Sequence, residues 1–320
     1  MSGRRFDLVL IVDWSARSAR SPARPSADAI WVGAAGAAGA EAPRYFRGRA
    51  EATDWLAGRM AMELAAGRRV LAGFDFPFGW PRGAAARVTG RPAALAVWDW
   101  LAAAVTDGVD NRNDRYAVAA RLNALWPGEG PFWGRPRSVW APGVSERKGD
   151  WRSPGRDALG WPPERRHVEV RESGAKTCWQ LAYAGSVGSQ VLLGLPSLAR
   201  LRADPRLAGR VAVWPFETGW SAGDAPAVLA EIYPSMLARA VAARRGADPA
   251  RRDGREILDR AQVRVLADAF AALDAAGGLA PLFGPPPGLQ GAALDEAERE
   301  EAWILGRDAK GALEAALGAA

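Results

Sequence analysis

Acidic residues stand at the carboxyl ends of three predicted strands, where together they could bind a cation. Asp13, Asp75 and Glu231 lie at or near the ends of short apolar runs, and such runs are typical of buried strands. An isolated carboxylate in an apolar run is costly to bury unless it is paired or liganded. In open α/β sheets, ligands bind beyond the carboxyl ends of the strands. The three predicted strands are 7–14, 69–76 and 227–233.

Carboxylates that converge at one sheet edge form a hard, oxygen-rich site suited to Mg²⁺ or Mn²⁺. Two such ions about 4 Å apart can hold the attacking and leaving oxygens of a phosphodiester. We therefore expect Asp13, Asp75 and Glu231 to be metal ligands. The simpler alternative is that Asp13 and Asp75 only cap the turns that follow their strands.

A further ligand is expected from the amphipathic helix predicted over 254–276. Asp259 and Asp268 are the candidates, and at ~100° per residue they lie on opposite sides of that helix. Only one of them can face the strand ends. Asp259 is nearer the helix start, where a site-facing acid belongs, and Gln262 follows one turn later on the same face. The alternative is a solvated, charged helix face.

The elements that must position these acids follow the order strand, strand, strand, helix, strand. Residues 28–34 are predicted to pair antiparallel with the first strand across the loop 15–27. A short strand over 44–47 and a helix over 51–66 follow, and Gly67 is a suitable C-cap. This order predicts an α/β fold with a mixed sheet and helices on both faces.

We expect one main domain over 1–280 that contains an insertion at about 80–205. Residues 281–320 are expected to be a Pro/Gly linker and an Ala/Glu-rich helix over 291–318, packed on the same domain. Residues 167–172 are predicted as a strand.

Within this insertion, the irregular stretch 126–166 lies between a helix predicted over 115–125 and the strand predicted over 167–172. A further helix predicted over 186–203 is expected to break at Gly194 and Pro196. The irregular stretch interleaves tryptophan with arginine, which suits stacking on bases and pairing with phosphates. A surface loop pinned by tryptophan is the equal alternative. These residues are Trp126, Trp133, Trp140, Trp151 and Trp161, with Arg135, Arg137, Arg147, Arg152, Arg156, Arg165 and Arg166.

Two loops could contact an anionic substrate. The loop 110–115 carries two arginines that could pair with a phosphate, or it could be a loop-to-helix junction capped by Asn113 or Asp114. The small residues of 184–190 present backbone amides ahead of a helix, which is a possible anion nest. The expected substrate-binding residues are Arg112, Arg115, Ser186, Ser189 and Gln190.

Composition excludes several function classes. The single Cys178 and single His167 exclude a disulfide framework and HExxH-type metal chemistry. The chain has no Walker lysine motif, no strand followed by GxGxxG, and no membrane-length apolar run. The N-terminal apolar run reaches Asp13 too early for a signal peptide, so a cytoplasmic location is expected. The net charge of +6 permits contact with phosphates without requiring it.

The sequences around the acids resemble the domain-of-unknown-function family 429, which is described as predicted nucleases of ribonuclease H-like fold. The resemblance covers about residues 7–276. It rests on Asp13-Trp-Ser, Phe-Asp75-Phe-Pro-Phe-Gly, Ala-Glu231-Ile-Tyr-Pro-Ser and Asp259-x-x-Gln. It implies a ribonuclease H-like fold in which Asp13, Asp75 and the helix acid are metal ligands. The family's last helix often carries a denser acid cluster than this one.

Three further stretches, 110–115, 131–134 and 178–190, resemble a proteobacterial subgroup of that family. Its members are often labelled as proteins of molybdopterin guanine dinucleotide or cobalamin synthesis. The leading hypothesis is a metal-dependent phosphodiester hydrolase with Asp13, Asp75 and Asp259 as catalytic residues and a nucleic acid or nucleotide as partner. The alternatives are a nucleotide- or pterin-related enzyme of cofactor synthesis and a non-catalytic ribonuclease H-like binding module.

Overall fold

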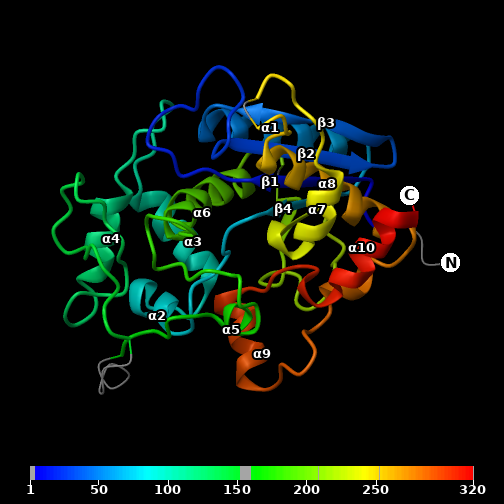
Figure 1. The fold of residues 1–320 in the computed structure, drawn as a ribbon. Helices are drawn as coiled ribbons and strands as arrows, with labels where there is room; N and C mark the ends of the chain where they lie inside the picture. Colours follow the sequence, from blue (N-terminus) through cyan, green and yellow to red (C-terminus); the bar gives the residue numbers. More distant parts are fainter. Residues whose placement is uncertain (1–3, 152–159, 208, 252, 320) are drawn as a thin grey trace.

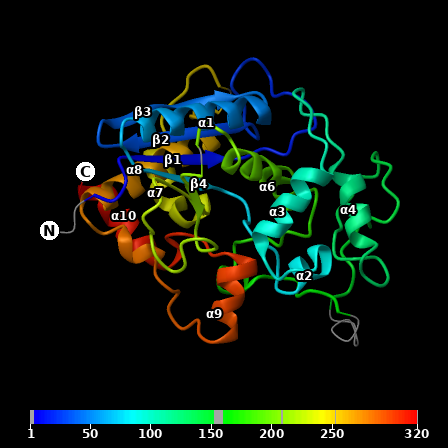
Figure 2. The same ribbon diagram turned by 180° about the vertical axis from the view of Figure 1, so that it is seen from behind.

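The structure, a computed structural model, describes residues 4–151, 160–207, 209–251 and 253–319. At their centre is a six-stranded mixed sheet with the order β3-β2-β1-β4-β6-β5, flanked by helices (Figures 1 and 2). The predicted α/β class with a mixed sheet is confirmed. The strands are β1 Leu8–Asp13, β2 Ile30–Gly36, β3 Gly39–Phe46, β4 Val70–Phe74, β5 Val211–Val213 and β6 Ala227–Glu231.

The register of the parallel strands decides which of the strand-end acids meet. β1 pairs antiparallel with β2 and parallel with β4, and β6 runs parallel to β4 on its other side. Val12 lies opposite Phe74, and Phe74 lies opposite Glu231. Asp13 follows Val12 and Asp75 follows Phe74, so the two acids are neighbours at the ends of adjacent strands. Because strand side chains alternate between faces, Glu231 lies on the opposite face of the sheet from those two acids.

The central strands β1, β4 and β6 are apolar on both sides and are covered on both faces, whereas most of the edge strand β3 is exposed. In β1, Leu10 and Val12 belong to the core beneath helices α1 and α6. Val9 and Ile11 belong to the core beneath helix α8 on the other face. These helices span Arg49–Ala65 (α1), Gly188–Arg202 (α6) and Leu258–Ala275 (α8).

Between β4 and β5 the chain forms a group of helices beyond the carboxyl ends of β1 and β4 (Figures 1 and 2). α6 returns from this group to pack against α3 and α1. Among the described residues, no helix combines the length and the apolar composition that a membrane crossing needs. The other helices are α2 Ala84–Thr89, α3 Ala94–Ala104, α4 Arg115–Asn123, α5 His167–Arg171, α7 Ala238–Arg244, α9 Ala292–Glu296 and α10 Lys310–Ala319.

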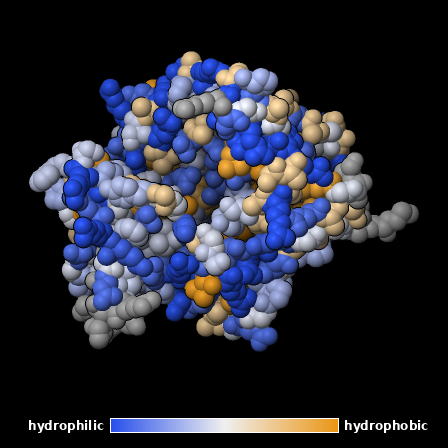
Figure 3. All heavy atoms as spheres, viewed as in Figure 1, coloured by the Kyte–Doolittle hydropathy of each residue, from blue (hydrophilic) through white to orange (hydrophobic). Residues whose placement is uncertain are grey.

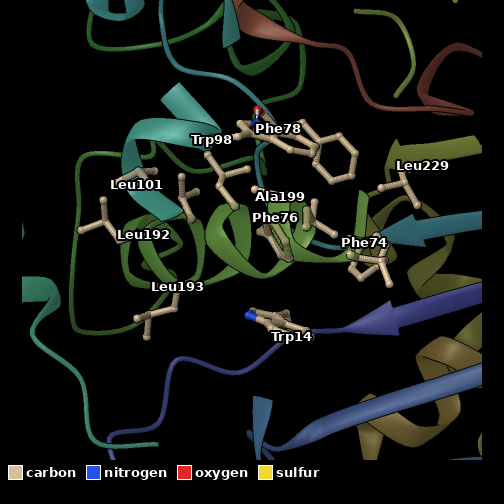
Figure 4. Packing of buried hydrophobic residues seen from close by; sticks show 14 of the residues in the cluster. Trp14, Phe74, Phe76, Phe78, Trp98, Leu101, Leu192, Leu193, Ala199 and Leu229 are labelled. Atoms are coloured by element: carbon tan, nitrogen blue, oxygen red, sulfur yellow. Dashed lines mark hydrogen bonds between the residues drawn. The ribbon is translucent and has the colours of Figure 1, made fainter. Parts of the chain in front are cut away.

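The break expected in α6 is wrong, because the helix runs without interruption through Gly194 and Pro196. A Cβ at Gly194 would lie 2.4 Å from the ring of Phe76. The glycine therefore lets this ring pack directly on the helix, as Figure 4 shows for Phe76 beside α6. Burial of every residue from Val191 to Ala199 outweighs the low helix propensity of Gly194 and Pro196.

The strand expected over 167–172 is instead the short helix α5. The backbone amide of Arg166 donates to Glu169 at 3.1 Å, and the Arg166 guanidinium donates to the same carboxylate at 2.7 Å. Glu169, at the third helical position, thus accepts the backbone amide that precedes the helix and fixes the helix start, which apolar periodicity alone does not show.

The helix expected over 291–318 is divided. After α9 the chain forms a π-helical turn over Ala297–Glu301, and Ala302 then adopts a positive φ of 63°. Ile304 forms a bridge beside Glu231 at the end of β6, and α10 begins only at Lys310. The interruption occurs where the backbone at Ile304 pairs with the carboxyl end of β6.

The irregular stretch 126–166 contains turns and isolated bridges in its described part. Most of its tryptophans pack inward: the rings of Trp151 and Trp179 stack with centroids 6.2 Å apart, and Trp161 meets Trp151 edge-on. Trp140 is the exception, with 90% of its area exposed. Arg152 and Arg156 lie outside the described residues. The packing favours a loop pinned by tryptophan over a base-stacking surface.

Candidate functional site

Three of the predicted acids meet at the carboxyl ends of β1 and β4. Asp13 ends β1, Asp75 follows β4, and Asp259 lies in the first turn of α8. A hydrogen bond joins the carboxyl groups of Asp13 and Asp75, and Asp259 is close enough to act electrostatically on both. Asp75 follows Asp13 by 62 positions in the sequence, and Asp259 follows Asp75 by 184. The fold brings the three residues together.

Backbone amides hold the acids in place. The amide of Trp14 donates to Asp75 Oδ1 at 2.8 Å, which connects the end of β1 to the end of β4. The amide of Asp28 donates to Asp259 Oδ2 at 2.8 Å, and Asp28 itself has a φ of 55°. The loop between β1 and β2 therefore positions the helix acid.

Aromatic residues pack against the same strand ends on the α6 side of the sheet. Trp14, next to Asp13, contacts Phe74 and Phe76, which flank Asp75, with ring centroids 6.4 and 6.1 Å apart. Figure 4 shows these rings between the sheet and α6. Because such rings pack in few arrangements, the two acids project from a rigid support.

Burial and mutual repulsion change the ionisation of the acids. Burial, followed by the charges of Asp75 and Asp259, raises the pKa of Asp13 well above its ordinary value. Burial raises the pKa of Asp75 to about 7, and burial also raises the pKa of Asp259. At neutral pH the Asp13–Asp75 pair therefore retains a proton, as expected for two carboxyls that share a site.

The chemistry of this pair fits a hard divalent cation. A cation would replace the shared proton and remove the repulsion between the two carboxylates. Within the described ranges, no three His, Cys, Asp or Glu side chains are gathered closely enough to enclose a metal ion. Mg²⁺ often binds through one or two carboxylates and keeps several waters. Asp13 and Asp75 match that mode, with Asp259 beside them.

A cavity of about 340 Å³ opens next to Asp13 and Asp259, and we call it the Asp13 cavity. Figure 3 shows a hollow near the middle of the face seen in Figure 1. Four of the predicted substrate-binding residues line the Asp13 cavity, and the structure adds Tyr116 from α4 and Arg17 from the loop after β1. The four are Arg115, Ser186, Ser189 and Gln190.

Arg115 is a buried cation without a carboxylate partner in the described structure. It is 9% exposed, and its guanidinium donates to Ser189 Oγ at 2.9 Å and to Ser18 Oγ at 2.8 Å. It also bonds Asn113 Oδ1 at 2.7 Å and lies 4.7 Å from the ring centroid of Tyr116. These partners are neutral, so the positive charge remains available to an anion in the cavity.

The other loop arginine does not join the site. The side chain of Arg112 is 87% exposed and lies 3.3 Å from Asp110. The loop from 107 to 113 folds back on itself, with the Gly108 amide donating to the Arg112 carbonyl at 2.8 Å. The structure thus places Arg115, and not Arg112, beside the acids.

Glu231 does not join Asp13 and Asp75, although it was expected to bind the same metal. Both of its carboxylate oxygens lie 2.7 Å from Arg166 guanidinium nitrogens, and Oε2 also accepts the Phe78 amide at 2.9 Å. The one-residue offset in register turns it to the other face, where it forms a buried ion pair. Asp268 also lies elsewhere, in a groove between β2 and α8.

Several residues near the acids were not among the predicted site residues. Tyr116 and Arg17 enter the Asp13 cavity through tertiary contact only, and Asp28 contributes its backbone amide. Lys176 and Tyr233 line a second cavity beside Asp75. Lys176 could have been noticed as one of three lysines in an arginine-rich chain.

The chain matches no protein-family model, and comparison with curated proteins and with solved structures found no significant match.

Proposed function

We propose that this protein is a metal-dependent phosphodiester hydrolase of ribonuclease H-like type, related to the domain-of-unknown-function family 429. The observation that carries the proposal is the meeting of Asp13 and Asp75 at the ends of adjacent parallel strands, joined by the Trp14 amide, with Asp259 beside them. A sheet that begins with three antiparallel strands, and whose central strands are covered on both faces, supports it.

Asp13 and Asp75 would hold Mg²⁺ or Mn²⁺, with Asp259 next to the ion. When bound, the ion supplies Lewis-acid activation of water and of the phosphate. The carboxylates of the chain orient around it, because the amides of Trp14 and Asp28 fix Asp75 and Asp259.

Substrate binding is assigned to the residues around the ion. Arg115 neutralises a phosphate oxygen from the wall of the Asp13 cavity, since its charge has no carboxylate partner there. The start of α6 adds the positive end of a 15-residue helix, which favours an anion at Ser186 and Ser189. These groups would hold the phosphodiester against Asp13 and Asp75.

The second candidate is an enzyme that acts on a small nucleotide- or pterin-like molecule. Two cavities of about 340 Å³ flank the acids, and this volume lies within the usual range for small-ligand sites, roughly 300–1,000 Å³. Both candidates use the same acids and differ in the size of the substrate.

The test begins with metal binding. Mg²⁺ and Mn²⁺ are titrated into the metal-free protein while melting temperature and tryptophan fluorescence are followed. Saturable stabilisation is expected for the wild type and not for Asp13→Asn. Asp268→Asn is the matched control, because it makes the same change on α8 away from the site, and it should respond like the wild type.

Hydrolysis is then measured on bis(p-nitrophenyl) phosphate, a fluorescent single-stranded oligonucleotide and a dinucleotide. Activity that needs the metal and falls at least 100-fold in Asp13→Asn supports the proposal. Full activity in that variant, or metal binding without any hydrolysis, contradicts it. Cleavage of the dinucleotide alone favours the small-molecule candidate.

A further inference from the structure

A second cavity lies on the far side of the acid pair, and we call it the Asp75 cavity. It has a volume of about 340 Å³ and is formed by the segment after β4, the start of α6 and the turn after β6. Ser186 and Gln190 line both this cavity and the Asp13 cavity. The amide of Gln190 donates to the Trp14 carbonyl at 2.7 Å, so this side chain marks the boundary between the two.

Five polar side chains that line the Asp75 cavity have no hydrogen-bond or ion-pair partner among the described residues. They are the ammonium group of Lys176, the side-chain amide of Gln262 and the hydroxyl groups of Tyr233, Ser186 and Ser235. Two acids line this cavity: Glu231 is neutralised by its ion pair with Arg166, and Asp75 is the member of the acid pair that faces the cavity. The cavity therefore offers one unpaired cation and four neutral hydrogen-bonding groups to a ligand.

Two glycines and several apolar side chains complete the walls of the Asp75 cavity. A Cβ at Gly174 would lie 2.6 Å from the hydroxyl oxygen of Tyr233, and one at Gly185 would lie 3.0 Å from Lys176 Cε. The two glycines thus make room for the polar side chains. Flat or branched apolar groups complete the lining, namely Phe76, Pro77, Val187, Ile232, Pro234 and Ile304.

A nucleotide unit matches this combination of groups. Its phosphate needs a cation, its sugar and base edges need hydrogen-bonding groups, and the faces of its base need apolar contact. We propose that the Asp75 cavity binds one unpaired nucleotide of the substrate, next to the phosphodiester held at Asp13 and Asp75. This inference rests on the proposed function for the position of the bond that is cleaved.

The inference narrows the substrate class. A base that is paired and stacked in a duplex cannot enter a cavity of this kind without leaving the stack, which costs a few kcal/mol. The substrate is therefore a single-stranded nucleic acid or a small nucleotide diester, and a duplex is disfavoured. The two cavities would hold the units on either side of the reacting phosphate.

Calorimetric titration of adenosine monophosphate into the full-length Asp13→Asn variant tests the site without turnover. In this background, Lys176→Ala should weaken binding at least tenfold and Lys176→Arg should largely restore it. Lys148→Ala is the matched control, because Lys148 pairs with Glu164 outside both cavities. Inorganic phosphate should bind at least tenfold more weakly than the nucleotide, since it cannot use the apolar walls.

Competition experiments complete the test. A single-stranded oligonucleotide should displace the nucleotide, whereas the same strand in a duplex should not. The inference is overturned if the nucleotide does not bind, if Lys176→Ala binds normally, or if phosphate binds equally well. It is also overturned if the loss of affinity follows Arg115→Gln instead, because binding then lies in the Asp13 cavity.

The outcomes separate this inference from the proposed function. Nucleotide binding that depends on Lys176, without any metal-dependent hydrolysis by the wild type, would leave the cavity assignment standing and refute the hydrolase. Hydrolysis that depends on Asp13, with neither nucleotide binding nor KM changed by Lys176→Ala, would support the hydrolase and refute the cavity assignment.

Discussion

Replacing Asp75 with asparagine is expected to stabilise the metal-free protein at neutral and alkaline pH. The pKa of about 7 for Asp75, against an ordinary 3.8, corresponds to about 4 kcal/mol at ~1.4 kcal/mol per pH unit. This is an upper limit, because Asp13 shares the same proton. Asparagine is neutral and keeps the oxygen that accepts the Trp14 amide. A gain of about 1–3 kcal/mol in the free energy of unfolding is expected.

The sign of the shift fixes the pH dependence. A carboxyl whose pKa is raised by folding contributes its full stability below its ordinary pKa, and that stability is lost as the pH rises through the folded-state pKa. The advantage of Asp75→Asn should therefore be small near pH 4, grow up to about pH 7 and then level off. Asp99→Asn, a change at an exposed position on α3, is the control and should show no such trend.

Urea unfolding followed by tryptophan fluorescence, in EDTA from pH 4.5 to 8.5, measures both the size and the trend. An Asp75→Asn variant that is less stable than the wild type at pH 8 would refute the electrostatic reasoning. A gain that stays constant across the pH range would do the same, because it would then arise from packing and not from charge.

Three further changes, the last with a matched control, test other parts of the structure. Arg115→Gln removes the cation of the Asp13 cavity, so KM in the hydrolysis assay should rise at least tenfold. Glu231→Gln weakens the buried ion pair of Arg166 and should cost about 3–5 kcal/mol in urea unfolding, with a far smaller loss of metal affinity than Asp13→Asn. Gly194→Ala forces a methyl group into an aromatic ring and should cost about 1–3 kcal/mol. Gly311→Ala, in α10 with open space around it, should instead stabilise by up to about 1 kcal/mol.

The convergence of Asp13, Asp75 and Asp259 could be anticipated from the sequence. Apolar runs that end in an acid indicate parallel strands with a shared edge, and helical periodicity separates Asp259 from Asp268. The structure places Asp259 with the strand-end acids and Asp268 in a different groove. Local patterns were sufficient here because strands and helices have fixed geometric periods.

Glu231 is the case in which local sequence patterns gave the wrong position for a side chain. Its sequence context is as suggestive as that of Asp75, yet a register difference of one residue turns its side chain to the other face of the sheet. Register depends on contacts between distant segments, which a single sequence does not reveal. The same limit explains why Arg112 and Arg115, three positions apart in one loop, could not be told apart before the path of that loop was known.

The buried pair of Glu231 and Arg166 still serves the candidate site. Arg166 also donates to the Glu301 carbonyl at 2.6 Å, and the Glu301 carboxylate accepts the amide of Arg82 at 2.8 Å. One guanidinium thus connects the end of β6, the start of α5 and the segment after α9. These segments include part of the wall of the Asp75 cavity. Glu231, which is not part of the proposed metal site, therefore supports the shape of the neighbouring cavity. A charge that is buried and fully paired is costly to disturb, which makes it suited to fixing a binding surface and unsuited to exchanging a metal ion.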